Sequence, residues 1–129
     1  MLEGVFQQMA TILVVEDNDD IREMMAVTLE LEGHEVHMAA NGRQALVRLE
    51  NGLRPTLILL DLMMPVMNGW EFRSALQRDE RFRDIPVIVI SAIGGDVVSH
   101  SAGAYLSKPI DMETLLDVVS DYSGGRTTH

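Results

Sequence analysis

Short, unbroken apolar runs, separated by helical patterns, constrain the fold of this chain more than any other feature of its sequence. Three clear runs and a weaker fourth one occur along the chain, at residues 12–15, 57–60, 87–90 and 104–106. A continuous apolar run is typical of a strand buried on both faces, whereas a strand with one exposed face alternates in polarity. We therefore expect these runs to form a sheet that is covered on both sides.

Helical patterns lie between these runs, and each begins near a residue that can cap a helix. After the expected cap Asn18 or Asp19, the positions at helical spacing are Ile21, Met25 and Leu29, and after Asn41 they are Ala45, Leu46 and Leu49. After Asn68 they are Trp70, Phe72 or Arg73, and Leu76, and after Asp111 they are Leu115, Leu116, Val118 and Val119. We expect Trp70 to be a core residue. With residues 35–39 as one more strand, strands and helices alternate, which predicts βαβ units, right-handed crossovers and a mostly parallel sheet.

Polar residues stand at the points where the predicted strands end. Glu16 and Asp17 follow the first predicted strand, Asp61 ends the third, Ser91 follows the fourth and Lys108 follows the fifth. In open α/β sheets, ligands bind in the crevice beyond the carboxyl ends of the strands. We therefore expect three acids, a hydroxyl group and an ammonium group to converge at that edge of the sheet.

Three clustered carboxylates call for a cation. Two carboxylates about 4 Å apart repel by roughly 4 kcal/mol at an effective dielectric constant near 20, so without a cation at least one would take up a proton. Oxygen ligands, with no His or Cys at these strand ends, favour Mg²⁺ over Zn²⁺ or a fully protein-caged Ca²⁺. An Asp beside such a cation, facing a Lys and a Ser, has the groups that phosphoryl transfer to a carboxylate requires. We expect Asp61 to form an acyl phosphate.

Taken singly, each acid among residues 16–20 is better explained as part of a solvated loop or helix cap. The coincidence of polar residues at four strand ends favours a functional site. Four separated segments resemble the signature segments of response regulator receivers and occur in the same order, at residues 12–17, 60–69, 90–92 and 108–109. The resemblance extends over residues 11–122.

The resemblance implies an α/β fold: a doubly wound (βα)5, flavodoxin-like three-layer sandwich with a parallel sheet in the strand order 2-1-3-4-5. It also implies a phosphorylation-dependent signalling switch of a two-component system or phosphorelay. Such a protein is not an enzyme, apart from catalysing its own Asp phosphorylation and dephosphorylation. The implied partners are a sensor histidine kinase or histidine phosphotransfer protein, which donates the phosphoryl group, and a downstream protein target.

The resemblance further assigns roles to individual residues. Asp61 is the phospho-acceptor and acts with Lys108 and Ser91; the Mg²⁺ ligands are Glu16, Asp17, Asp61 and the backbone carbonyl of Met63; the switch residues are Ser91 and Tyr105; and the phosphoryl group is bound by Ala92 and Lys108. By sequence alone, an ordinary half-buried tyrosine explains Tyr105 at least as well. The Lys108–Pro109 bond is expected to be cis, since cis bonds are largely confined to X-Pro.

Two stretches bear on how such a switch would behave. Met63 and Ile93 lie where the family tunes the access of hydrolytic water, and because both are apolar we expect slow self-dephosphorylation.

Only 17 positions separate Ser91 from Lys108, fewer than the family usually has, so residues 93–101 must supply the fourth helix of the fold. Two adjacent glycines there oppose helix formation by about 1 kcal/mol each relative to Ala. We expect a shortened or disordered fourth helix, which bears on dimerisation and partner docking.

Composition limits the partners and the compartment. With 10 Lys and Arg against 20 Asp and Glu, the chain has a formal charge of −10 and lacks the basic footprint of a DNA-binding domain. It has no cysteine and no apolar run that could form a secretory signal or cross a membrane, so we expect a cytoplasmic protein. We also expect it to be a monomer or a weak dimer. Residues 1–10 are expected to be an upstream extension or a cloning remnant, 11–122 the receiver domain, and 123–129 a flexible tail.

Three other functions compete with this interpretation. A phosphatase of the haloacid dehalogenase kind also uses an Asp nucleophile with Mg²⁺, but it needs a second acid at the position of Met63. A flavin site would need a hydroxyl-rich phosphate loop where Glu16 and Asp17 would instead repel a phosphate. A degenerate receiver would be an interaction module without phosphorylation. The presence of Asp17, Asp61, Ser91 and Lys108 argues against it, whereas the short fourth helix is compatible with it.

Overall fold

A five-stranded parallel sheet forms the middle layer of the computed structural model, which describes residues 9–64, 66–92 and 104–122. Its strands are β1 (Thr11–Val15), β2 (Glu35–Ala39), β3 (Leu57–Asp61), β4 (Val87–Ser91) and β5 (Ala104–Ser107). They are arranged in the order β2-β1-β3-β4-β5, and every neighbouring pair is parallel. The predicted fold class and strand order are therefore confirmed.

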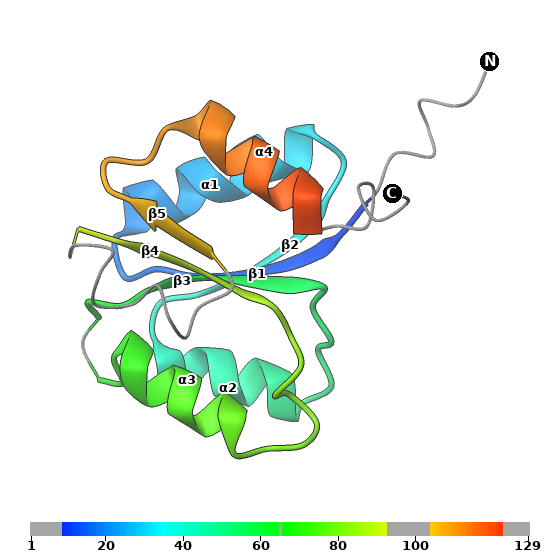
Figure 1. Ribbon diagram of the computed structural model, residues 1–129, viewed down its shortest axis with the longest axis vertical. Coiled ribbons are helices and arrows are strands. Elements are labelled where there is room, and N and C mark those ends of the chain that lie inside the picture. The colour runs from blue at the N-terminus through cyan, green and yellow to red at the C-terminus, as the bar shows by residue number, and fades with distance from the viewer. Residues whose placement is uncertain (1–8, 65, 93–103, 123–129) are drawn as a thin grey trace.

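Helices cover both faces of the sheet (Figure 1). Helices α1 (Asp19–Leu31) and α4 (Met112–Tyr122) lie on one face, and α2 (Gly42–Glu50) and α3 (Gly69–Gln77) lie on the other. Each pair closes its own hydrophobic core against the sheet, so the molecule has the three predicted layers. No helix in the described ranges is long and apolar enough to cross a membrane. Residues 1–8 of the predicted extension at 1–10, the predicted fourth helix at 93–101 and the predicted tail at 123–129 lie outside the described residues.

Asn side chains begin three helices at the predicted positions. The Oδ1 atoms of Asn18, Asn41 and Asn68 each accept a hydrogen bond of 2.9 Å from the backbone amide three residues later. At α3 the cap is reciprocal, because Glu71 Oε1 also accepts from the Asn68 amide at 3.0 Å. These caps satisfy amide groups that a helix start otherwise leaves without partners. They also fix the turns between the strand ends and the helices, where the predicted site lies.

Gly69 brings the start of α3 against the segment that follows β3. Its amide donates to the carbonyl of Leu62 at 2.9 Å, and a Cβ at this position would lie 2.6 Å from the Leu62 Cα. Backbone atoms cannot withdraw from such a contact as a flexible side chain can. Gly69 is therefore required for space, and the close approach holds the loop after Asp61 against the helix.

Trp70 does not lie in the core, so that prediction was wrong. Its side chain is 39 % exposed, while Phe72 and Leu76 supply the buried face of α3. Residues two positions apart point to nearly opposite sides of a helix. Because Phe72 faces the sheet, Trp70 must face away from it.

Candidate functional site

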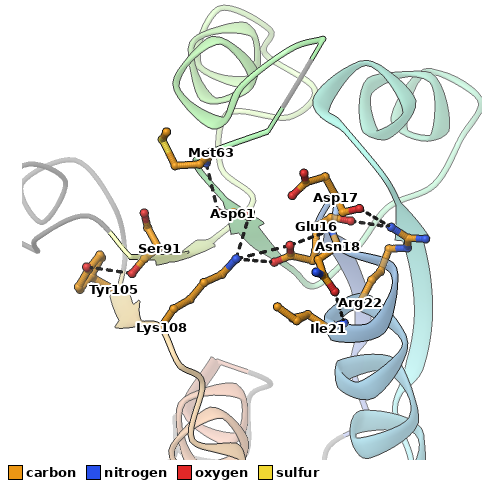
Figure 2. A network of polar contacts seen from close by, with 10 residues as sticks. All are labelled: Glu16, Asp17, Asn18, Ile21, Arg22, Asp61, Met63, Ser91, Tyr105 and Lys108. Atoms are coloured by element: carbon orange, nitrogen blue, oxygen red, sulfur yellow. Dashed lines mark hydrogen bonds and ion pairs between the residues drawn. The ribbon is translucent and has the colours of Figure 1, made fainter.

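Three acidic residues meet at the carboxyl ends of β1 and β3 (Figure 2). Glu16 and Asp17 follow β1, Asp61 ends β3, and one carboxylate oxygen from each lies within 4.8 Å of the others. Glu16 and Asp61 are 0 % and 3 % exposed, whereas Asp17 is exposed. The two strands are parallel neighbours, so their ends reach the same edge of the sheet. The structure thus brings together the three acids on which the sequence prediction rested.

Lys108 reaches these acids from the segment after β5. Its Nζ atom lies 3.3 Å from Oδ2 of Asp61 and 3.2 Å from Oε1 of Glu16. The lysine side chain is only 22 % exposed, so these ion pairs are partly shielded from water and screened less than surface pairs. The pairing with Glu16, 92 positions away, was not predicted, and no local sequence signal could reveal it. The Lys108–Pro109 bond is cis, as predicted.

The site holds more negative than positive charge, because Glu16, Asp17 and Asp61 face the ammonium group of Lys108. Burial raises the pKa of Glu16 and of Asp61, and nearby carboxylates raise both further, against opposing hydrogen bonds and the lysine charge. Burial alone would lower the pKa of Lys108, but the two carboxylates outweigh it and raise that pKa. The neighbouring carboxylates thus raise all three pKa values, and a divalent cation would offset this excess of negative charge.

Glu16 has one carboxylate oxygen that is only partly satisfied. Oε2 accepts a hydrogen bond of 3.0 Å from the amide of Asn18. Oε1 is buried and accepts no hydrogen bond within the described part of the chain, although Nζ of Lys108 is 3.2 Å away. A buried carboxylate oxygen in this condition is costly and would gain from a cation or a cation-bound water. An all-oxygen donor set with one exposed carboxylate suits Mg²⁺, which keeps several waters.

Backbone contacts orient the acids. The Met63 amide donates to Oδ1 of Asp61 at 3.2 Å, which leaves Oδ2 directed at Lys108. The predicted ligand role of the Met63 carbonyl remains a prediction. Nη1 of Arg22 donates to the Glu16 carbonyl at 2.8 Å and so holds the turn after β1. Sequence analysis missed Arg22, although its position four residues after the Asn18 cap places its side chain one turn away from this loop.

Ser91 and Tyr105 lie on the other side of Asp61 from Glu16 (Figure 2). Ser91 is fully buried at the end of β4, the strand that pairs with β3. Its carbonyl accepts hydrogen bonds from the Lys108 amide at 3.1 Å and from the Tyr105 hydroxyl at 3.2 Å. Ala92 follows directly and is exposed. The structure brings these residues to the edge where Asp61 lies, and their roles as switch and phosphoryl-binding groups remain predictions.

Comparison with known proteins gives concordant matches. Residues 12–120 match the sequence profile of the response regulator receiver domain. The chain is 36 % identical over 122 residues to the protein PilH of Pseudomonas aeruginosa, an alignment that covers 91 % of this chain and 100 % of PilH. It is 37 % identical over 113 residues to the DNA-binding dual master transcriptional regulator RpaA of Synechocystis sp., covering 84 % of this chain and 46 % of RpaA. The chain therefore spans about half the length of RpaA.

Among solved structures, the chain resembles the receiver domain of the sensor histidine kinase PA1611 from Pseudomonas aeruginosa. The TM-score is 0.80 at 29 % identity, and the alignment covers 90 % of this chain and 98 % of that one. That crystal structure is described with a magnesium ion coordinated in its active site cleft.

Proposed function

Because the chain belongs to the response regulator receiver domain family, we propose that it is a signalling switch that accepts a phosphoryl group on Asp61 with the help of Mg²⁺. The observation that carries the proposal is the position of Asp61. Its buried carboxylate lies 3.3 Å from the Lys108 ammonium and beside two further acids. The signal passes on by protein contact, and the chain acts on no substrate other than its own aspartate.

The metal site we propose consists of the carboxylates of Glu16, Asp17 and Asp61 and the backbone carbonyl of Met63. The excess negative charge among these acids supports it, as does the partly satisfied Oε1 of Glu16. The magnesium ion in the related receiver domain of PA1611 supports it by analogy. When bound, Mg²⁺ offsets negative charge on the phosphoryl oxygens and on the attacking carboxylate.

In the proposed reaction a carboxylate oxygen of Asp61 attacks the phosphorus of a phosphohistidine. The new O–P bond forms as the N–P bond breaks, and the histidine nitrogen leaves with the bonding electrons. Lys108 then pairs with a phosphoryl oxygen, while the Ser91 hydroxyl and the Ala92 amide donate to others. Movement of Ser91 toward the phosphoryl group would disturb the hydrogen bond from Tyr105 to the Ser91 carbonyl, which is 3.2 Å long in this structure.

The proposed phosphodonor is a sensor histidine kinase or a histidine phosphotransfer protein in the cytoplasm, and the output is contact with a downstream protein. Helix α1 begins directly after the acidic turn and carries three exposed apolar side chains, Met24, Val27 and Leu31, spaced by three and four residues. Such spacing makes one apolar stripe on a helix. We place the docking of the donor on this stripe.

The proposal is tested by the intact mass of the protein, and of Asp61→Asn, after incubation with acetyl phosphate with and without Mg²⁺. We expect a gain of one phosphoryl group that requires both Mg²⁺ and Asp61. Unchanged mass in a folded protein that binds Mg²⁺ would refute the phosphorylation switch. It would favour the alternative of a degenerate receiver that acts only as an interaction module.

A further inference from the structure

The positive charge of the chain is concentrated in the layer of α2 and α3. Residues 42–86 contain seven of the ten Lys and Arg residues, all of them arginine, and six of the twenty acids. The rest of the chain has three cations and fourteen acids. Since α2 and α3 cover one face of the sheet and α1 and α4 the other, the molecule is electrostatically polarised across its layers (Figure 1).

Two shallow grooves run along α3 and meet at Ser74 and Arg78. The first, of about 530 Å³, includes Arg43 and Val66 in its lining, and the second, of about 660 Å³, includes Trp70. Because the grooves share two residues, they form one surface. We call it the α3 surface and define it by Arg43, Val66, Trp70, Ser74 and Arg78.

Apolar side chains are exposed on the α3 surface. Trp70 is 39 % exposed and Val66 is 71 % exposed. Val66 also has φ of 69°, in the left-handed region that a β-branched residue rarely adopts because its Cβ lies too close to the following carbonyl oxygen. Strained residues of this kind cluster at binding and active sites, where another interaction offsets their cost. Because Val66 is largely exposed, its side chain gains little from packing within the described residues, whereas a bound partner would cover it.

Arg43 and Arg78 are available for a partner. Neither forms an ion pair within the described residues, whereas Arg81 is bound to Asp79. Glu71 also lines the first groove, but its carboxylate accepts from the Asn68 amide in the helix cap. Guanidinium groups suit carboxylates because they can bind both oxygens at once.

We propose that the α3 surface binds an acidic peptide segment of a partner protein, one that carries aromatic or aliphatic side chains among its carboxylates. The carboxylates pair with Arg43 and Arg78, and the apolar side chains pack on Trp70 and Val66. A nucleic acid fits less well, because its long charged backbone would also meet the rest of the chain, where acids outnumber cations by fourteen to three in the sequence. A short peptide contacts only the basic face.

The test is a titration of the full, ¹⁵N-labelled chain with a short synthetic peptide of alternating Asp, Glu and Phe residues. We expect chemical-shift changes at the five residues of the α3 surface and none along α1 or α4. The double variant R43E/R78E should bind the peptide about tenfold or more weakly, which corresponds to about 1.4 kcal/mol or more. The matched control R48E/R83E changes the net charge equally at exposed positions outside both grooves, and should bind within about threefold of the unchanged chain.

Several results would overturn the proposal: no binding, shift changes elsewhere, or equal weakening in the two double variants. Tighter binding of a single-stranded oligonucleotide than of the peptide would show that the α3 surface binds nucleic acid and not an acidic peptide. Self-association that R43E/R78E abolishes would show that a second copy occupies the surface. Neither arginine contacts Asp61, so phosphorylation of R43E/R78E by acetyl phosphate should be unchanged, which separates this test from that of the proposed function.

Discussion

The ammonium group of Lys108 lies 3.3 Å from Oδ2 of Asp61, although 47 positions separate the two residues in the chain. The same nitrogen lies 3.2 Å from Oε1 of Glu16. One cation is therefore shared by two buried carboxylates that would otherwise repel each other. This sharing explains why the site is deficient in positive charge and leads to two of the predictions below.

Replacing Lys108 with Met should lower the free energy of unfolding by about 1–3 kcal/mol at neutral pH without Mg²⁺. A fully buried carboxylate that loses its partner costs about 3–5 kcal/mol, and partial exposure of this lysine reduces that cost. Urea denaturation measures the change, and saturating Mg²⁺ should recover part of it. The control Arg83→Met removes an exposed arginine outside any described ion pair and should cost less than about 0.5 kcal/mol. Equal losses in the two variants would contradict the shared-cation interpretation.

Mg²⁺ should raise the melting temperature of the protein, because it binds three carboxylates that are clustered only in the folded state. At a hundredfold excess over the dissociation constant, the stabilisation is about 2.7 kcal/mol. Scanning calorimetry with Mg²⁺, compared with NaCl at the same ionic strength, measures the part of the stabilisation that is specific to Mg²⁺. Asp17→Asn should remove most of it without unfolding the protein, since Asp17 is exposed. A rise of the same size with NaCl would show that simple screening is responsible.

Phosphorylated Asp61 should lose its phosphoryl group slowly. The side chain of Met63 is apolar and 57 % exposed, and its amide already binds Asp61, so no polar group at this position orients an attacking water. Met63→Asn should speed the loss about tenfold, as followed by intact mass over time after removal of acetyl phosphate. Met24→Asn, at a similarly exposed methionine on α1, is the control and should change nothing. A half-life of seconds in the unchanged protein would contradict the prediction.

Val66→Asn should stabilise the protein by about 1 kcal/mol, because Asn tolerates the left-handed conformation that Val66 adopts at φ of 69°. Asn also avoids the extra freedom that Gly would give the unfolded chain. Val66→Ala removes the β-branch but lacks the short polar side chain that lets Asn hydrogen-bond locally in this conformation, so its gain should be smaller. Thermal unfolding of the unchanged protein and of the two variants measures these gains. A loss of stability in Val66→Asn would show that the valine makes a favourable contact within the chain.

Stability should fall as the pH is lowered from about 7.5 to 5.5, partly because of His34. Its Nδ1 accepts a hydrogen bond of 3.0 Å from the Ala10 amide, which requires the neutral ring. Burial lowers the pKa of His34 below its ordinary value of 6.5, despite the opposing charge of Glu32. The unfolded chain therefore binds this proton more readily, so stability decreases as the pH falls through 6.5 toward the folded pKa.

The variant His34→Asn keeps an acceptor at the position of Nδ1 but cannot bind a proton in this range. Its unfolding free energy should change less between the two pH values than that of the unchanged protein. The comparison isolates His34, since all other titrating groups are common to both proteins. Identical pH dependence in the two would refute the role of His34.

Much of the fold follows from local signals in the sequence. Continuous apolar runs predicted the buried strands, and Asn18, Asn41 and Asn68 predicted the starts of three helices, because burial on two faces and helix capping each depend on a few adjacent residues. Trp70 shows the limit of this approach. Its apolar character indicated the core, but which side of α3 faces the sheet depends on the neighbouring Phe72 and on how the helix packs.

The sequence by itself determined the class of fold and the convergence of Glu16, Asp17 and Asp61, because the carboxyl ends of parallel neighbouring strands must meet at one edge. Only the tertiary structure decided that Lys108 is shared between two acids, and that Val66 is strained and exposed above a groove lined by arginines. These relationships join side chains across distant segments or depend on one backbone angle. Packing of the whole chain sets their distances and burial, and no local pattern of residue types encodes them.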